Sequence, residues 1–173
     1  DLEEQLSDII GNFEHSIFLL EKNDGTPEQI IAIYRKMQET VHAQAEKYRA
    51  LGLDDTSDYI QDLQKKWWDY QDTIEDMLHD IYQTAVDNHN NMLSLLENQY
   101  DMLDNNQTKD AMLDNLYKQL EEQKKIQEEA HKEERRLRDL GLDENDEAIQ
   151  DCINAWWGAY NDIQDINSKI ADN

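Results

Sequence analysis

A block in the middle of the chain occurs a second time near its end, and this duplication constrains the fold more than any other feature. The first copy contains LGLD at 51–54, IQD at 60–62 and WW at 67–68, and these recur at 140–143, 149–151 and 156–157. The shift is 89 residues within this block and 83 residues for the apolar positions before it. Such self-similarity indicates one structural unit repeated along the chain. We therefore predict two domains, residues 1–82 and 83–173.

Each domain is predicted to contain three helices. Helix breakers are scarce, with 5 Gly and 1 Pro in 173 residues, and apolar residues recur at spacings of three and four. Thr26, Pro27 and Gln29 form a helix-start signature, whereas Gly52 and Gly141 are placed to end helices in the left-handed conformation. The expected helices cover about 2–22, 27–51 and 56–82 in the first domain, and about 83–104, 108–140 and 145–171 in the second.

The third helix of each domain carries the clearest apolar seam. Its spacings alternate between three and four, as in a coiled coil. The predicted core positions are Ile60, Leu63, Trp67 and Ile74 in the first domain, and Ile149, Cys152, Trp156 and Ile163 in the second. Trp68 and Trp157 lie about 100° further round the helix, on a flank that we expect another helix to cover. We interpret the tryptophan pairs as one packing device used twice, rather than as platforms that stack on bases or sugars.

No Gly or Pro lies between Gly52 and Gly141. The third helix of the first domain is therefore predicted to continue into the first helix of the second, over about 56–104. The weak point is DNHNN at 87–91, because Asp, Asn and His are poor helix formers, and a break there would produce a hairpin. The predicted fold class is all-α, with two tandem three-helix coiled-coil bundles that share this central helix. Spectrin repeats offer an analogy of architecture.

The second copy contains six more residues than the first, within the highly charged segment 118–136. Glu and Lys or Arg recur there at the spacings that support a solvated helix. Polar Gln123 and Gln127 occupy seam positions where Leu would be expected. We predict that this helix is the least tightly packed in the chain.

The net charge of -24 disfavours whole classes of partner. Nucleic acids and anionic membrane surfaces are bound by clustered Lys and Arg, so neither is expected as a partner. No apolar run approaches the roughly 20 residues of a membrane span. We see no secretion signal, and the start without Met suggests a piece of a longer protein.

Residues with catalytic or metal-binding chemistry are present, but their pattern does not indicate a site. The motif Glu-x-x-His, found in di-iron bundles, occurs at Glu39/His42 and Glu128/His131. Val41 and Ala130 occupy the apolar seam positions next to these motifs, so the side chains of Glu39 and Glu128 should point outward. His89 occupies a seam position and should be a partly buried, hydrogen-bonded histidine, while Cys152 should be a small core residue. We predict no enzyme activity and no catalytic, cofactor-binding or metal-binding residues.

The segment VHAQAEKYRALGLDDTSDYIQDLQKKWWDYQDTI at 41–74 resembles a part of the tail tape-measure proteins of phages and prophages that infect Gram-positive gut bacteria. The second copy of the repeat resembles it more loosely. The resemblance implies a long, helical, non-enzymatic protein that is packed inside the tail and whose length sets the tail length. It also implies contacts with further copies of itself, tail-tube subunits and assembly chaperones. Its place would be the bacterial cytoplasm during assembly and then the virion tail.

The acidic composition also supports a second hypothesis. The chain could be an acidic helical interaction module that binds a basic partner or mimics DNA. A long helical parent protein would favour the tape-measure hypothesis, whereas a salt-sensitive complex with a DNA-binding protein would favour the interaction module.

Overall fold

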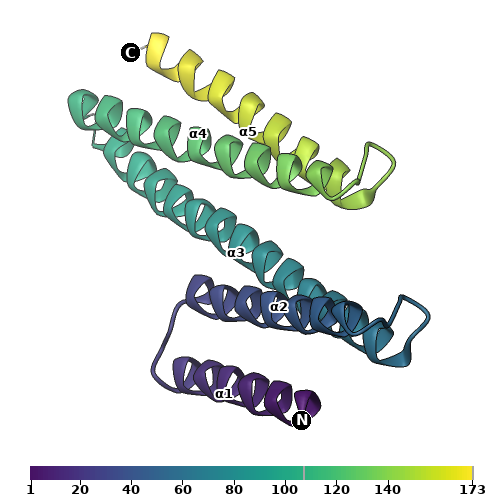
Figure 1. Ribbon diagram of the computed structural model, residues 1–173. Helices are drawn as coiled ribbons and strands as arrows, with labels where there is room; N and C mark the ends of the chain where they lie inside the picture. The colour runs from purple at the N-terminus through teal and green to yellow at the C-terminus, as the bar shows by residue number, and fades with distance from the viewer. Residues whose placement is uncertain (107, 173) are drawn as a thin grey trace. The chain divides into compact units, whose positions relative to one another are not determined.

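The computed structural model describes residues 1–106 and 108–172, and all regular secondary structure in these ranges is α-helical. The helices are α1 (Leu2–Lys22), α2 (Pro27–Ala50), α3 (Asp58–Asn105), α4 (Lys109–Asp139) and α5 (Glu147–Ala171) (Figure 1). The predicted all-α fold is confirmed, and each helix begins and ends close to its predicted position.

Helix α3 is a single helix of 48 residues that runs without a break through 87–91. Val86 and Leu93, on either side of this polar segment, are buried, and His89 within it contacts Glu122 of α4. These tertiary contacts outweigh the low helix propensity of Asp and Asn. The chain divides into two compact units, Asp1–Asp80 and Ile81–Asn173, so the boundary falls inside α3.

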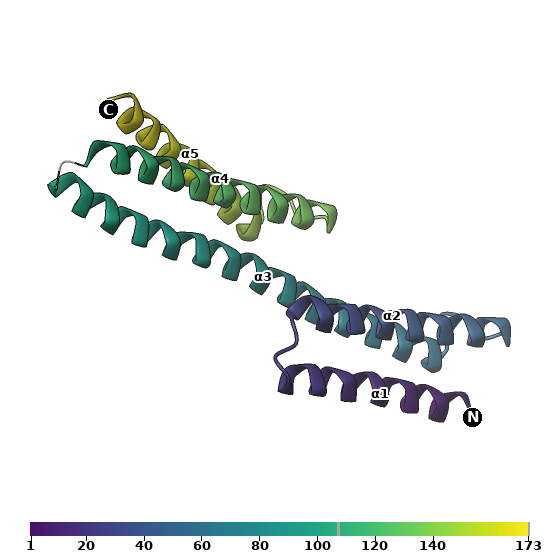
Figure 2. The ribbon, with the colours of Figure 1, turned by 90° about the vertical axis from the view of Figure 1, so that its left-hand side faces the viewer.

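The first unit packs α1, α2 and the beginning of α3 around two apolar clusters. Consecutive helices in this unit run antiparallel (Figure 2). One cluster draws on all three helices and consists of Leu6, Val41, Ala45, Tyr48, Ile60 and Leu63. The other is formed by Ile17, Ile30 and Met37. Burial of these side chains is the main stabilising contribution to the unit.

The second unit is built from the remainder of α3 together with α4 and α5. Leu93, Ile126 and Ala159 form a cluster with one residue from each helix. A further cluster contains Leu137, Ile149 and Cys152, with Tyr82 of α3 packed against it. In both units together, the structure buries the predicted seam residues Ile60, Leu63, Ile74, Ile149, Cys152 and Ile163.

The prediction that α4 is the least tightly packed helix is wrong, because nine of its 31 residues are buried, whereas α1 buries two of 21. Gln123 is 6% exposed and donates to a carboxylate oxygen of Asp162 in α5 at 3.1 Å. Gln119 donates to the side chain of Asn115 at 2.7 Å, and Asn115 donates to the carbonyl of Leu96 at 2.9 Å. Polar seam residues are thus buried with hydrogen-bond partners, which removes most of the desolvation penalty.

Candidate functional site

The turn that joins α2 to α3 recurs between α4 and α5 with the same helix-ending backbone bonds. In the first turn, the amide of Gly52 donates to the carbonyl of Arg49 at 2.9 Å, and the amide of Leu53 donates to Tyr48 at 3.1 Å. The matching bonds in the second turn are Gly141 to Arg138 at 2.9 Å and Leu142 to Leu137 at 3.2 Å. Both glycines have φ of 97°, the left-handed conformation that ends a helix in this way. The helix-ending role predicted for Gly52 and Gly141 is confirmed.

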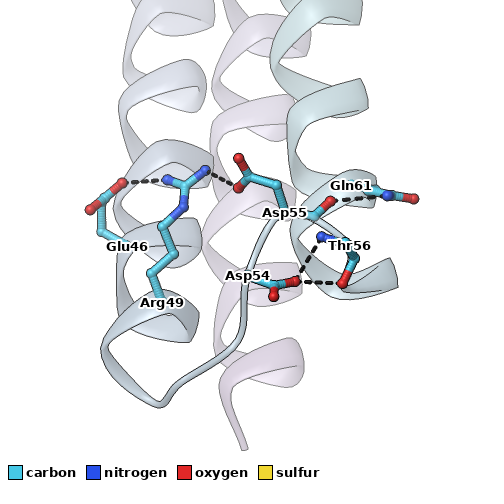
Figure 3. Close-up of polar contacts among 6 residues, drawn as sticks. All are labelled: Glu46, Arg49, Asp54, Asp55, Thr56 and Gln61. Atoms are coloured by element: carbon cyan, nitrogen blue, oxygen red, sulfur yellow. Dashed lines mark hydrogen bonds and ion pairs between the residues drawn. The ribbon is translucent and has the colours of Figure 1, made fainter.

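Polar groups around the first turn form two sets of contacts, one centred on Arg49 and Asp55 and the other on Asp54 (Figure 3). Arg49 contacts Glu46 in its own helix and donates to Asp55 beyond the turn at 2.9 Å. Asp54 accepts hydrogen bonds from the amide and hydroxyl of Thr56, and these bonds lower the pKa of the Asp54 carboxyl. The amide of the Gln61 side chain donates to the carbonyl of Asp55 at 3.0 Å.

The second turn repeats the first set of contacts with its own residues. Arg138 contacts Glu144 beyond the turn at 2.7 Å and Glu134 in its own helix at 3.0 Å. Gln150 donates to the carbonyl of Glu144 at 2.9 Å. These polar contacts stabilise the turn between the two helices in both copies of the LGLD motif.

The two tryptophan pairs have the same geometry. Trp67 and Trp68 meet edge to face with ring centroids 4.9 Å apart, and Trp156 and Trp157 do so at 4.8 Å. The first member of each pair is half-buried, and Trp67 packs against the apolar cluster of the first unit. The second member is exposed, 61% for Trp68 and 53% for Trp157. The prediction that another helix covers Trp68 and Trp157 is therefore wrong.

The reason lies in which helix faces this flank. A small groove of about 190 Å³ beside Trp68 is lined by residues of α2 and α3 alone: Val41, His42, Ala45, Arg49, Leu63, Gln64 and Trp67. The flank thus points past the edge of α2 rather than toward α1. In the second unit, Trp157 instead lies edge to face with Tyr160 at 5.2 Å, and Trp156 stacks on Tyr160 at 5.7 Å.

The histidines that suggested metal chemistry lie apart from one another. Glu39, His42, Glu128 and His131 are all exposed on α2 and α4. His89 is 22% exposed, and its Nδ1 lies 2.7 Å from a carboxylate oxygen of Glu122. His89 is therefore the partly buried, hydrogen-bonded residue that the sequence predicts. Within 1–106 and 108–172, no group of three or more His, Cys, Asp or Glu residues is placed to hold a metal ion.

Cys152 is 2% exposed in the core of the second unit. Burial, together with the negative charge of Glu133, raises the pKa of its thiol to about 11. Tyr82 of α3 shares a hydrogen bond with this thiol, and burial raises the pKa of the Tyr82 hydroxyl. The thiol is consequently neutral near pH 7, which suits a core residue and not a nucleophile.

A groove of about 490 Å³ lies between α1 and the beginning of α3 in the first unit. Its wall combines apolar, aromatic and charged side chains: Glu3, Leu6, Ser7, Ile10, Gly11, Glu14, Tyr48, Tyr59, Asp62, Leu63, Lys66 and Tyr70. Sequence reasoning missed this groove. A usable signal was present, because the repeat replaces Tyr48, Tyr59 and Tyr70 by Leu137, Ala148 and Ala159.

Across the helices that the structure describes, no segment is long and apolar enough to cross a membrane. Comparison with protein-family models, curated proteins and solved structures finds no match for this chain.

Proposed function

We propose that the chain is a non-enzymatic structural segment of a phage tail tape-measure-like protein, in which it acts as a rigid element that sets length and guides assembly. The observation that carries this proposal is α3, one helix of 48 residues that contributes to the cores of both units. A helix has a fixed rise of about 1.5 Å per residue, so a segment of this type relates chain length to distance.

The repeated turn supports the same proposal. Gly52 and Gly141 reverse the chain through the same backbone bonds, and the Arg49–Asp55 pair recurs as Arg138–Glu144. Arrays of repeats grow by adding units that end in the same way. The neutral, buried Cys152 thiol is also in keeping with a role that involves no covalent catalysis.

The resemblance to tape-measure proteins implies which partners the chain would bind in this role. They are further copies of the chain, tail-tube subunits and assembly chaperones, which the chain would meet in the bacterial cytoplasm before it enters the virion tail. Nucleic acids and membranes are not among them, because the acidic charge repels phosphate groups.

The test is an in-frame deletion of one repeat from the phage or prophage gene that encodes the chain. Removal of 52–140 joins Leu51 to Gly141 and preserves one complete turn. Electron microscopy should show tails shortened by a fixed amount, up to about 130 Å if each of the 89 residues contributes a full helical rise. Replacement of the deleted segment by an unrelated helical segment of equal length should restore the tail length. Infectious particles with tails of unchanged length would refute the proposal.

A second candidate function is the acidic interaction module, and the net charge of -24 favours it. Such a module would bind a basic DNA-binding protein through long-range attraction, which salt screens. Calorimetric titration of the chain with a histone protein at about 0.05 M and about 0.5 M NaCl measures this. Binding that is absent at both salt concentrations would exclude the module.

A further inference from the structure

The groove between α1 and the beginning of α3 is, we propose, a docking site for a segment of a partner protein that carries Arg or Lys side chains. Its volume of about 490 Å³ accommodates more than one such side chain. This inference does not depend on the tape-measure role. The net charge of the chain favours a basic partner but does not show where that partner binds, and the groove supplies this location.

Three tyrosines give the groove its aromatic surface. Tyr59 is 51% exposed, and its ring centroid lies 5.3 Å from that of Tyr48 beneath it. Tyr70 is half-buried further along the same wall. The faces of aromatic rings attract guanidinium and ammonium groups, most strongly where water is partly excluded. The arrangement therefore offers stacking surfaces for cationic side chains.

Three carboxylates, Glu3, Glu14 and Asp62, line the groove against a single ammonium group, that of Lys66. Burial raises the pKa of the Tyr70 hydroxyl, and the charge of nearby Glu14 raises it further. The excess of carboxylates over ammonium groups gives the groove a negative potential. Carboxylates and aromatic faces together are the surface that arginine recognises best.

In the second unit, the same scaffold packs without tyrosines at the three corresponding positions. At the position of Tyr70, the second unit has Ala159, which is 4% exposed and packs against Leu93. Leu93 corresponds in the repeat to Ile10, which lines the groove in the first unit. The shared scaffold therefore closes over a small residue in one unit, whereas the other carries the half-buried Tyr70 near Tyr59, which is 51% exposed.

The acidic charge of the groove favours a basic partner over a second copy of the chain. A second copy of the chain would bring another net charge of -24 to an acidic groove, so like-charge repulsion opposes it. The second unit shows the favoured chemistry within the chain itself, since the ammonium group of Lys169 lies 5.5 Å from the ring centroid of Tyr100. That contact lies in a groove also lined by carboxylates, among them Asp101 and Asp165.

The experiment uses the full chain and a fluorescein-labelled peptide of four Arg-Leu-Gly repeats, followed by fluorescence anisotropy at about 0.15 M NaCl. Tyr59→Ala installs the residue that the second unit carries at this position, and Asp62→Asn removes one groove carboxylate. Asp151→Asn makes the same charge change at the matching exposed position of the second unit. We expect Tyr59→Ala and Asp62→Asn each to weaken binding about fivefold, and Asp151→Asn to weaken it less than about twofold.

The outcomes separate the alternatives. Equal weakening by Asp62→Asn and Asp151→Asn would show attraction to overall charge and would overturn the groove assignment, while leaving both proposed functions standing. Absence of peptide binding would overturn it as well. Sedimentation equilibrium provides a further check: a dimer that Tyr59→Ala dissociates would identify a second copy of the chain as the occupant. Circular dichroism melting confirms that each variant is folded before binding is measured.

Discussion

The clearest test of the repeated turn is the replacement of its glycine by alanine in each unit. Gly52 and Gly141 both have φ of 97°, and a Cβ added at either position meets nothing within 4 Å. The effect of Gly52→Ala or Gly141→Ala is therefore a backbone effect without steric collision. Forcing an L-residue into the left-handed region costs about 1–2 kcal/mol. Replacing glycine by alanine also lowers the conformational entropy of the unfolded chain, and this stabilises the folded state by about 0.4–1 kcal/mol.

The difference between these two effects predicts that each substitution destabilises the protein by about 1 kcal/mol. Urea unfolding followed by circular dichroism at 222 nm measures this change, which corresponds to a lowering of the melting temperature by about 2–4 °C for a chain of 173 residues whose two units unfold together. Because the glycines lie in separate turns of a chain whose two units unfold together, the double variant should show the sum of the two effects.

Gly158 supplies the matched control. It lies inside α5, and a Cβ added there also meets nothing within 4 Å. Gly158→Ala should stabilise the protein by about 0.5–1 kcal/mol, because alanine is the better helix former. If Gly52→Ala proved neutral or stabilising, as Gly158→Ala is expected to be, the left-handed helix end would be refuted.

Further predictions concern the core. Trp67→Ala should destabilise by about 3–4 kcal/mol, whereas exposed Trp68→Ala should cost about 1 kcal/mol, mainly from the lost ring contact; urea midpoints that are equal for the two variants would contradict this. Gln123→Leu should stabilise by about 1 kcal/mol, because apolar burial outweighs one hydrogen bond to a solvent-accessible carboxylate, and a lower melting temperature would count against it. The raised pKa of Cys152 means that the unfolded state loses this proton first, so stability should fall as pH rises from about 9 to about 11. Cys152→Ala should weaken that pH dependence in thermal melts, and an unchanged profile would argue against the assignment.

The helices and turns were predictable from sequence because local chemistry determines them. Thr26 accepts a hydrogen bond from the amide of Gln29 at 3.2 Å, and the side chain of Gln29 accepts one from the amide of Thr26 at 2.8 Å. This reciprocal cap needs no distant partner. The burial of Ile60 and Ile149 follows in the same way from the alternating spacing of the apolar residues.

Other features depend on how helices approach one another, and the sequence pattern does not encode this directly. The exposure of Trp68 and Trp157 depends on which flank of α3 or α5 a neighbouring helix covers. The burial of Gln123 depends on a carboxylate 39 residues away, which no local rule identifies. The groove with Tyr59 and Asp62 arises between α1 and α3, and only a comparison of the two repeats would have singled out its tyrosines.

The placement of the unit boundary between Asp80 and Ile81, inside α3, has a consequence for how the protein can come apart. Cleavage there would leave about four carbonyl groups on one side and about four amide groups on the other without helical partners. A fragment that ends at Asp80 would therefore fray at its new terminus. Melting of one unit would likewise remove the helical hydrogen-bond partners of the residues of the other unit that lie next to the boundary. Heat or proteolysis should thus act on the two units as coupled rather than separate events.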